Sequence, residues 1–364
     1  MAVVVRPALV CHGVRVLQAR AFSDPTSWWT FAAIHGFGLD RWREVGLMPA
    51  TPPPGAGFRN VLWDQCQHQS WYFLPWHRGY VLALEEEVRA AVVASGGPED
   101  WALPYWNYFR DPAIPPAFTE VSTPDGAPNP LRVRARFGPA GDGVIRIPRA
   151  QINARAMQLH AFTGTRNGSP GFGGLDTGFS HEGETSGALE SQPHNVVHVL
   201  IGGRGVLDGR SVSGVMSDPR TAGLDPVFWL HHANIDRMWA AWNAAGEQDP
   251  RGEAWLEGPT ARRFALPRLS GKIEEFEPSE MRRIDDLGYG YDSLDVGAVA
   301  VTTAPEGMQR PSARKVGQRW TVAWNSWVRT RSLSCWNPVA GRTSCGWSRR
   351  SKRSPPASTV GWVR

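Results

Sequence analysis

Histidines that fall on apolar helical stripes constrain the fold of this chain more than any other feature. The pair Asp225-Pro226 supplies a helix N-cap and a proline at the first helical position. Apolar residues then recur at spacings of four and three, which predicts one buried helical face. That face consists of Phe228, His232, Ile235, Trp239 and Trp242. His232 is therefore predicted to point inward, whereas His231 lies about 100° away from it.

Two further segments place histidines on helical faces in the same way. Residues 76–94 predict a long helix whose buried stripe is His77, Val81, Leu84 and Val88. Another helix is predicted to start at the N-cap Asp24 and to end at Gly36. Its stripe is Trp28, Phe31 and His35. Stretches rich in Pro and Gly, such as residues 52–57 and 164–174, separate these segments. We therefore expect a mainly α fold with long irregular loops.

The positive charge of the chain is confined to its C-terminal end. The net charge of the 364 residues is +5, but residues 307–364 alone hold 12 Lys and Arg and no acidic residue. The first 306 residues hold 27 basic and 34 acidic residues, so the body is mildly acidic and gives no sign of nucleic-acid binding. We predict an ordered domain over residues 1–295 and a basic tail of low order over residues 296–364. The tail is either a disordered extension or the product of a shifted reading frame.

The chain shows no segment of the kind that crosses or enters a membrane. No stretch reaches the roughly 18 apolar residues that a spanning helix needs. The N-terminus lacks the basic region and the cleavage site of a signal peptide. A cytoplasmic protein without membrane contact is the default expectation, and export together with a partner is left open. Four cysteines, Cys11, Cys66, Cys335 and Cys345, do not make a disulfide framework at this length.

Two more histidines occur at helical spacing in the segment "PHNVVH". His194 and His198 are four residues apart, which on a helix brings both rings to one face where they can hold one ion. The spacing is that of the zinc-protease motif H-E-x-x-H, in which the glutamate is the general base. Asn195 stands at the glutamate position here. The hydrolytic base is missing, and the sequence argues against a metalloprotease.

Six histidines are thus available as inward ligands, three in each half of the body. They are His35, His68 and His77 in the first half, and His194, His198 and His232 in the second. Three neutral imidazoles leave an ion with an open position, and ligation by nitrogen alone favours copper or, less often, zinc. Two such sites facing each other would form a dinuclear centre suited to dioxygen. Asp236 is expected to orient an imidazole, with Arg237 neutralising it.

The motifs together resemble the tyrosinase, or polyphenol oxidase, family of type-3 copper proteins. The resemblance covers roughly residues 15–295 and is carried by "IHG", "CQH" and "FLPWHR" in the first half. In the second half it is carried by "LESQPHNVVH" and "DPVFWLHHANIDRMW". It implies a four-helix bundle that holds two copper ions. The six histidines match the family's copper ligands one by one, including the second histidine of the pair His231-His232.

The resemblance also assigns roles to residues beside the ligands. Cys66 matches a cysteine that is joined by a thioether to the histidine two residues on, here His68. Glu190 and Asn195 match a pair that holds a water able to deprotonate a phenol. The segment "GYGYD" at residues 288–292 resembles the tyrosine motif that closes the catalytic domain. Two positions depart from the family pattern: Asn107 replaces a usual Asp, and Pro219 stands where plant members often have a bulky Phe over the second copper.

The function that the resemblance implies is oxidation of phenols by dioxygen. A monophenol would be hydroxylated in the ortho position, and an o-diphenol would be oxidised to an o-quinone. The alternatives are a catechol oxidase without monophenolase activity and a dioxygen-binding protein similar to haemocyanins. The expected partners are a phenolic small molecule and dioxygen, and delivery of copper by a partner protein is left open. The residues do not specify the physiological phenol or the oligomeric state.

Overall fold

The computed structural model describes residues 7–165, 168–181 and 183–297. Helices dominate the described chain, and the prediction of a mainly α fold is confirmed. The α-helices are α1 (Pro7–Ala19), α2 (Trp28–His35), α3 (Leu39–Glu44), α4 (Ala56–Leu62), α5 (Phe73–Ala94), α6 (Val196–Gly202), α7 (Pro219–Ala222), α8 (Pro226–Ala244) and α9 (Glu253–Leu256). Shorter helical turns are η1 (Pro116–Phe118), η2 (Arg149–Gln151), η3 (Arg155–Gln158), η4 (Glu190–Asn195), η5 (Val215–Ser217) and η6 (Pro278–Met281).

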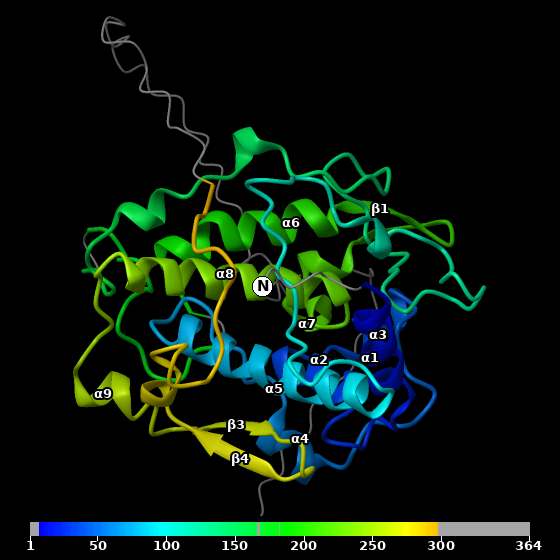
Figure 1. The fold of residues 1–364 in the computed structure, drawn as a ribbon, viewed down its shortest axis with the longest axis horizontal. Helices are drawn as coiled ribbons and strands as arrows, with labels where there is room; N and C mark the ends of the chain where they lie inside the picture. The colour runs from blue at the N-terminus through cyan, green and yellow to red at the C-terminus, as the bar shows by residue number, and fades with distance from the viewer. Residues whose placement is uncertain (1–6, 166–167, 182, 298–364) are drawn as a thin grey trace, which may run out of the picture. The chain divides into compact units, whose positions relative to one another are not determined.

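Four helices form the core of the described chain. Helices α5 and α8 are the two long members and pack against each other, and His35 of α2 and His198 of α6 contact the α8 residues Phe228 and His232 (Figure 1). The apolar stripes predicted for α5 and α8 are buried, as hydrophobic periodicity requires. Fully buried tryptophans fill the space around these helices, among them Trp28, Trp76, Trp229 and Trp239. The helices therefore pack around a core rich in buried aromatic side chains.

The helix starts show which capping signals of the sequence decide the structure. Asp225 accepts a hydrogen bond from the Val227 backbone N–H at 3.0 Å, and α8 begins at Pro226 as predicted. The start predicted at Asp24 is wrong, because α2 begins at Trp28 with Ser27 as its N-cap. The Asp24 carboxylate is already bonded to the backbone and hydroxyl of Thr26, so it caps a turn instead.

Two short antiparallel hairpins lie beside the helices. Strands β1 (Arg204–Leu207) and β2 (Arg210–Ser213) pair from Arg204–Ser213 to Leu207–Arg210, and β3 (Phe264–Pro267) pairs with β4 (Ile273–Phe276). Strand β3 packs against α5. The side chain of Gln65 bonds both backbone groups of Ala265, at 2.7 and 2.9 Å. This strand therefore anchors the start of the loop that carries His68.

A buried ion pair joins α5 to α8 behind the histidines. Arg78 Nε lies 2.5 Å from Asp236 Oδ1, and the hydroxyls of Tyr289 and Tyr291 donate to Asp236 Oδ2 at 2.6 and 2.5 Å. The expectation that Asp236 orients an imidazole is therefore wrong. Arg237 does not neutralise it either, because its guanidinium bonds Asn234 and backbone carbonyls. The tyrosines of the "GYGYD" motif thus support Asp236, and the Arg78–Asp236 ion pair joins the two long helices.

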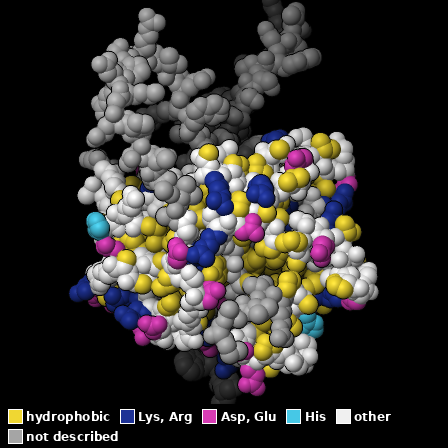
Figure 2. Space-filling view, turned by 45° about the horizontal axis from the view of Figure 1, so that its top comes forward, with side chains coloured by type: hydrophobic (Ala, Val, Ile, Leu, Met, Phe, Trp, Pro, Cys, Tyr) yellow, Lys and Arg dark blue, Asp and Glu magenta, His cyan; other side chains and the backbone are white. Residues whose placement is uncertain are grey.

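Contacts divide the chain into a first unit, Met1–Thr302, and a second, Thr303–Arg364. The predicted tail of residues 296–364 lies outside the described residues except for Val296 and Gly297, and Cys335 and Cys345 lie outside them too. None of the helices in the described ranges is both long enough and apolar enough to cross a membrane. Figure 2 shows acidic and basic side chains mixed with hydrophobic ones over the face in view.

Candidate metal centre

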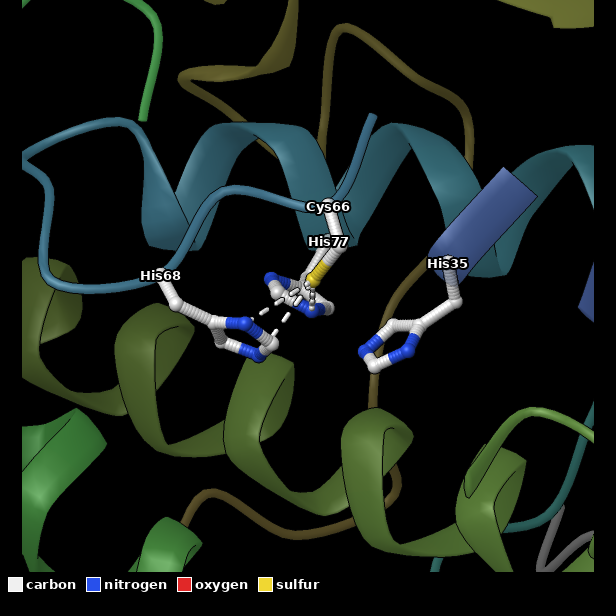
Figure 3. Close-up of side chains that lie close together, drawn as sticks. All are labelled: His35, Cys66, His68 and His77. Atoms are coloured by element: carbon white, nitrogen blue, oxygen red, sulfur yellow. Dashed lines mark hydrogen bonds between the residues drawn. The ribbon is translucent and has the colours of Figure 1, made fainter. Parts of the chain in front are cut away.

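The first histidine cluster combines residues from two helices and the loop between them. His35 is the last residue of α2, His77 lies on α5, and His68 lies in the loop that precedes α5. Cys66 lies among them, with its sulfur 3.3 Å from His68 Nε2 and 3.3 Å from His77 Nε2 (Figure 3). The ligand atoms of these four residues lie within 4.8 Å of one another, and all four residues are buried. The three histidines predicted for the first site therefore come together.

The second cluster is the more compact of the two. His194 lies in η4, His198 in α6 and His232 in α8. The Nε2 atom of His232 lies 3.3 Å from that of His194 and 3.2 Å from that of His198. Two nitrogens that are each about 2.0 Å from one ion, at a tetrahedral angle, are about 3.3 Å apart. The spacing of these nitrogens is that of a set of metal ligands.

The two clusters face each other between α5 and α8. The rings of His77 and His232 stack, with centroids 4.5 Å apart and planes inclined by 13°. The rings of His68 and His194 are 6.2 Å apart. Phe73 packs edge-on against His194 at 4.7 Å, and Phe228 lies 4.1 Å from the His232 ring. The two adjacent clusters therefore share the same aromatic walls.

Backbone carbonyls fix the orientation of the rings. The Nδ1 atoms of His35, His77 and His198 lie 2.8, 2.7 and 2.9 Å from the carbonyl oxygens of Pro219, Phe73 and Met216 respectively. A ring that donates from Nδ1 keeps the lone pair of Nε2 for a metal. Nε2 of His35 is buried and has no hydrogen-bond partner among the described residues. A buried nitrogen with a free lone pair fits the role of a metal ligand.

Burial keeps the ligand imidazoles neutral. It lowers the pKa of His77 to about 3 and that of His198 to about 4, and it lowers the pKa values of the other four candidate ligands well below their usual range. For every candidate ligand except His198, neighbouring histidines lower the pKa further. A neutral imidazole has a free lone pair at physiological pH, so no proton has to leave before a metal binds. Neutral nitrogen donors without a carboxylate fit copper.

His231 is buried beside the second cluster, although the helical stripe excludes it. Its ring stacks on that of His194, with centroids 5.2 Å apart. Burial lowers its pKa, and the backbone carbonyl of His194 opposes that shift. Neither ring nitrogen makes a hydrogen bond of normal geometry within the described chain, and one of them lies within 4.8 Å of the ligand atoms of the cluster. His232 is the better ligand, because its Nε2 is the atom on which His194 and His198 converge.

Glu190 and Asn195 lie beside the histidines and share Ser186 as a hydrogen-bond partner. The Glu190 carboxylate accepts the backbone N–H of Gln69 at 2.9 and 3.1 Å. Burial raises the pKa of Glu190 to about 8, and the bonds from Gln69, Gly187 and Ser186 lower it in part. Oδ1 of Asn195 lies 2.8 Å from Nδ1 of His194, and its amide donates to Ser186 at 3.2 Å. Asn195 therefore orients a candidate ligand.

Pro219 and Asn107, the two positions that depart from the family pattern, each make a defined contact in the structure. Pro219 begins α7, and its carbonyl oxygen touches the first cluster through His35. A Cβ atom at Gly36 would lie 2.9 Å from that oxygen, so glycine permits the close approach. Asn107 accepts the backbone N–H of Phe109 at 3.2 Å and keeps a structural hydrogen bond of the kind a carboxylate would make.

A family model decides what this arrangement belongs to. The model of the common central domain of tyrosinase matches residues 25–154 and 141–245, which contain both clusters. The chain belongs to the tyrosinase family. Two copper ions, one in each cluster, are the cofactors that fit the family and the six nitrogen donors.

Individual relatives agree with the family model. The chain is 37% identical over 301 residues to the tyrosinase HcTyr1 of a Hahella species, a match that spans 77% of this chain and 59% of the relative. It is 30% identical to the latent polyphenol oxidase of Prunus armeniaca over 56% of this chain and 34% of that one. The latent apple tyrosinase shares the fold with a TM-score of 0.55 at 21% identity, over 80% of this chain and 60% of that chain. The chain thus spans from about a third to three fifths of the length of these relatives.

Sequence reasoning missed the residues that hold the loop of the first cluster. Residues 175–180 make a series of hydrogen bonds to residues 67–71, although more than 100 positions separate them. The one signal in the sequence was the glycine-rich composition of residues 164–174, which precede them and which were assigned only to a loop. Gly174 has φ +117°, and a Cβ atom there would lie 3.0 Å from the Ser70 carbonyl oxygen.

Proposed function

We propose that the protein is a dicopper phenol oxidase. It would use dioxygen to hydroxylate monophenols in the ortho position, to oxidise o-diphenols to o-quinones, or both. The observation that carries the proposal is the pair of facing three-nitrogen clusters, with His77 stacked on His232. His35, His68 and His77 would hold one copper, and His194, His198 and His232 the other. When bound, the copper pair supplies dioxygen binding and redox chemistry.

The aromatic walls position a phenol and keep water away from it. Phe73 and Phe228 are fully buried and pack directly on ligand rings. A phenolic ring is apolar on its faces, so it enters such a site with its hydroxyl toward the ligands. The imidazoles around the site are neutral, and a pKa of about 8 leaves most of the Glu190 carboxyl protonated at pH 7.

Glu190 is the proposed proton acceptor for a monophenol. A phenol with a pKa near 10 is only about 0.1% ionised at pH 7, a deficit of about 4 kcal/mol. Only ionised Glu190 can take the proton. A pKa of about 8 brings that carboxylate closer to the phenol in basicity, and the ionised fraction grows as the pH rises toward 8. Asn195 holds His194 in place and leaves its second lone pair for the water that would carry the proton.

Two alternatives share this site. A catechol oxidase would lack useful monophenolase activity, and a haemocyanin-like protein would bind dioxygen without turnover. No contact in the described structure favours either one over the proposal. The sequence leaves open the delivery of copper by a partner protein.

Copper loading followed by parallel assays tests the proposal. The full chain is loaded with copper, and the metal content is measured before turnover of a monophenol and of a catechol. We expect two coppers per chain and turnover of both substrates. Turnover of the catechol alone would select the catechol oxidase, and dioxygen binding without turnover would select the carrier. A fully loaded protein that does neither would refute the proposal.

A further inference from the structure

His68 differs from the other five candidate ligands in how its backbone is held. The others lie in the helical segments α2, α5, η4, α6 and α8, of which η4 has a kink at Gln192, two residues before His194. His68 lies in a loop, and the next residue, Gln69, has φ +50°, a conformation that residues other than glycine rarely adopt. A loop in that conformation persists only where its surroundings determine it. Contacts from another part of the chain must therefore place His68.

Ser180 takes both backbone hydrogen bonds of His68. The His68 N–H donates to the Ser180 carbonyl oxygen at 3.0 Å. The Ser180 hydroxyl donates to the His68 carbonyl oxygen at 3.0 Å, and the Ser180 N–H donates to Oε1 of Gln67 at 2.9 Å. One residue thus fixes the ligand residue from both sides. The three bonds hold the peptide plane on each side of the His68 side chain.

Neighbouring contacts extend this arrangement along the loop. The Trp71 N–H donates to the Leu175 carbonyl oxygen at 3.0 Å, and the Trp71 indole donates to the Thr177 carbonyl oxygen at 3.0 Å. The hydroxyls of Ser70 and Thr177 are 2.7 Å apart. Gln67 and Ser70 are fully buried, so their hydrogen bonds have no competition from water. We call residues 175–180 with these contacts the Ser180 clamp.

We propose that Ser180 is a positioning residue for the first copper site. Its hydroxyl fixes the backbone of His68, and the clamp sets how well the first site holds its ion. The second site lies on helical backbone and does not depend on the clamp in this way. The assignment of His68 as a copper ligand rests on the proposed function. The hold of Ser180 on the His68 loop does not, because it is a property of the metal-free chain.

Copper titration of three variants tests the proposal. Ser180→Ala removes the bond from the hydroxyl and keeps both backbone bonds. We expect the first site to bind copper about 10-fold more weakly, the low end for a change next to a metal ligand. At limiting copper the variant should hold one ion, whose isolated copper(II) gives an electron paramagnetic resonance signal that a coupled pair lacks. Ser180→Thr keeps a hydroxyl and should restore binding at the first site.

Ser169→Ala is the matched control. It removes a hydroxyl from the preceding stretch of chain, where Ser169 Oγ accepts from the Gly171 N–H at 3.2 Å. Its first-site copper affinity should equal that of the wild type. An unchanged affinity in Ser180→Ala would overturn the proposal, and so would an equal loss at both sites.

A second measurement needs no copper. Hydrogen exchange of the metal-free protein should quicken at the backbone amides of residues 67–71 in Ser180→Ala and stay unchanged in α8. Unchanged exchange in the loop would overturn the positioning role even if the protein proved not to be an oxidase. Faster exchange in a protein without phenol turnover would leave the clamp standing and refute the proposed function alone.

Discussion

The two histidine clusters have the same ligand count but are built differently. In the second cluster, three Nε2 atoms from helical segments lie 3.2 and 3.3 Å apart and already have the spacing of ligands. In the first cluster, the sulfur of Cys66 lies between the rings of His68 and His77, and one ligand sits on a loop (Figure 3). The second site is therefore preorganised, whereas the first depends on a loop and its clamp. We expect the second site to bind copper more tightly.

The largest expected effect separates the two histidines at residues 231 and 232. His232→Ala removes the nitrogen on which His194 and His198 converge, so one copper per chain should be lost and phenol oxidation should fall to background. His231→Ala should keep both coppers, because its nitrogens do not share that convergence. The measurement is the copper content of each purified variant. Equal copper loss in both would mean that His231 is also a ligand and that the second site is a four-histidine cluster.

The next effect concerns Glu190, which bonds Gln69 beside the first cluster and Ser186 beside the second. Glu190→Gln keeps an oxygen that can accept the Gln69 N–H, so the loop of the first site should stay in place while the base is lost. The kcat/KM for a monophenol should fall by about 10²-fold, the range for a positioned general base. Catechol oxidation should fall much less. The assay compares the two activities at full copper occupancy, and an unchanged ratio would leave Glu190 with a structural role only.

A second variant, Glu190→Ala, and the pH dependence of stability separate the structural role of Glu190 from its role as a base. The alanine variant also loses the acceptor for Gln69, so it should weaken copper binding at the first site, which the glutamine variant should not. Burial raises the pKa of Glu190 to about 8 in the metal-free protein. A raised carboxyl pKa means that this group stabilises the fold below its ordinary pKa and that the contribution is lost as pH rises toward 8. The metal-free Glu190→Gln protein should therefore lose less stability over that range, as denaturant unfolding at several pH values would show.

A smaller effect concerns the sulfur in the first cluster. The thiol of Cys66 lies 3.3 and 3.6 Å from the ring nitrogens of His68, and burial raises its pKa well above the usual range. With copper and dioxygen present, we expect a bond from this sulfur to a ring carbon of His68. Two hydrogens are lost and dioxygen accepts the two electrons. Intact mass should fall by two hydrogens in the wild type and not in Cys66→Ala. Full alkylation of Cys66 in active protein would contradict the link.

The smallest effect is expected from removal of the tail. A chain ending near residue 300 keeps every described contact of both clusters, since these end before that point. It should retain two coppers and unchanged turnover, with improved solubility because the 12 basic residues of 307–364 are gone. Copper content and turnover of the shortened chain are the measurements. Loss of copper on truncation would show that the tail packs on the body.

The sequence predicted the parts of the site that follow from helical periodicity. The stripes of α5 and α8 placed His77 and His232 on buried faces, and the structure brings both to the centre. Periodicity is local, so it could not find the contacts between distant segments. Asp236 was assigned to an imidazole within its own helix, but its partner is Arg78, 158 positions away. The contact of Ser180 with His68 was not predicted for the same reason, since 112 positions separate the two residues.

Local signals also failed where two residues compete for one role. Asp24 and Ser27 are both good N-caps and lie three positions apart, and the turn formed by Asp24 with Thr26 leaves Ser27 to start α2. His231 shows the limit of a stripe in a crowded core. In α8 almost every side chain is buried, so burial alone does not identify the ligand. The direction of Nε2 does, and only the three-dimensional arrangement provides it.

Diffraction at the copper absorption edge from crystals of the copper-loaded chain tests the central claim most directly. It locates the ions independently of any assay. The account predicts two anomalous peaks per chain, one surrounded by His35, His68 and His77 and the other by His194, His198 and His232. The second should have the higher occupancy in crystals grown at limiting copper. A single peak, or a peak ligated by His231 in place of His232, would contradict it.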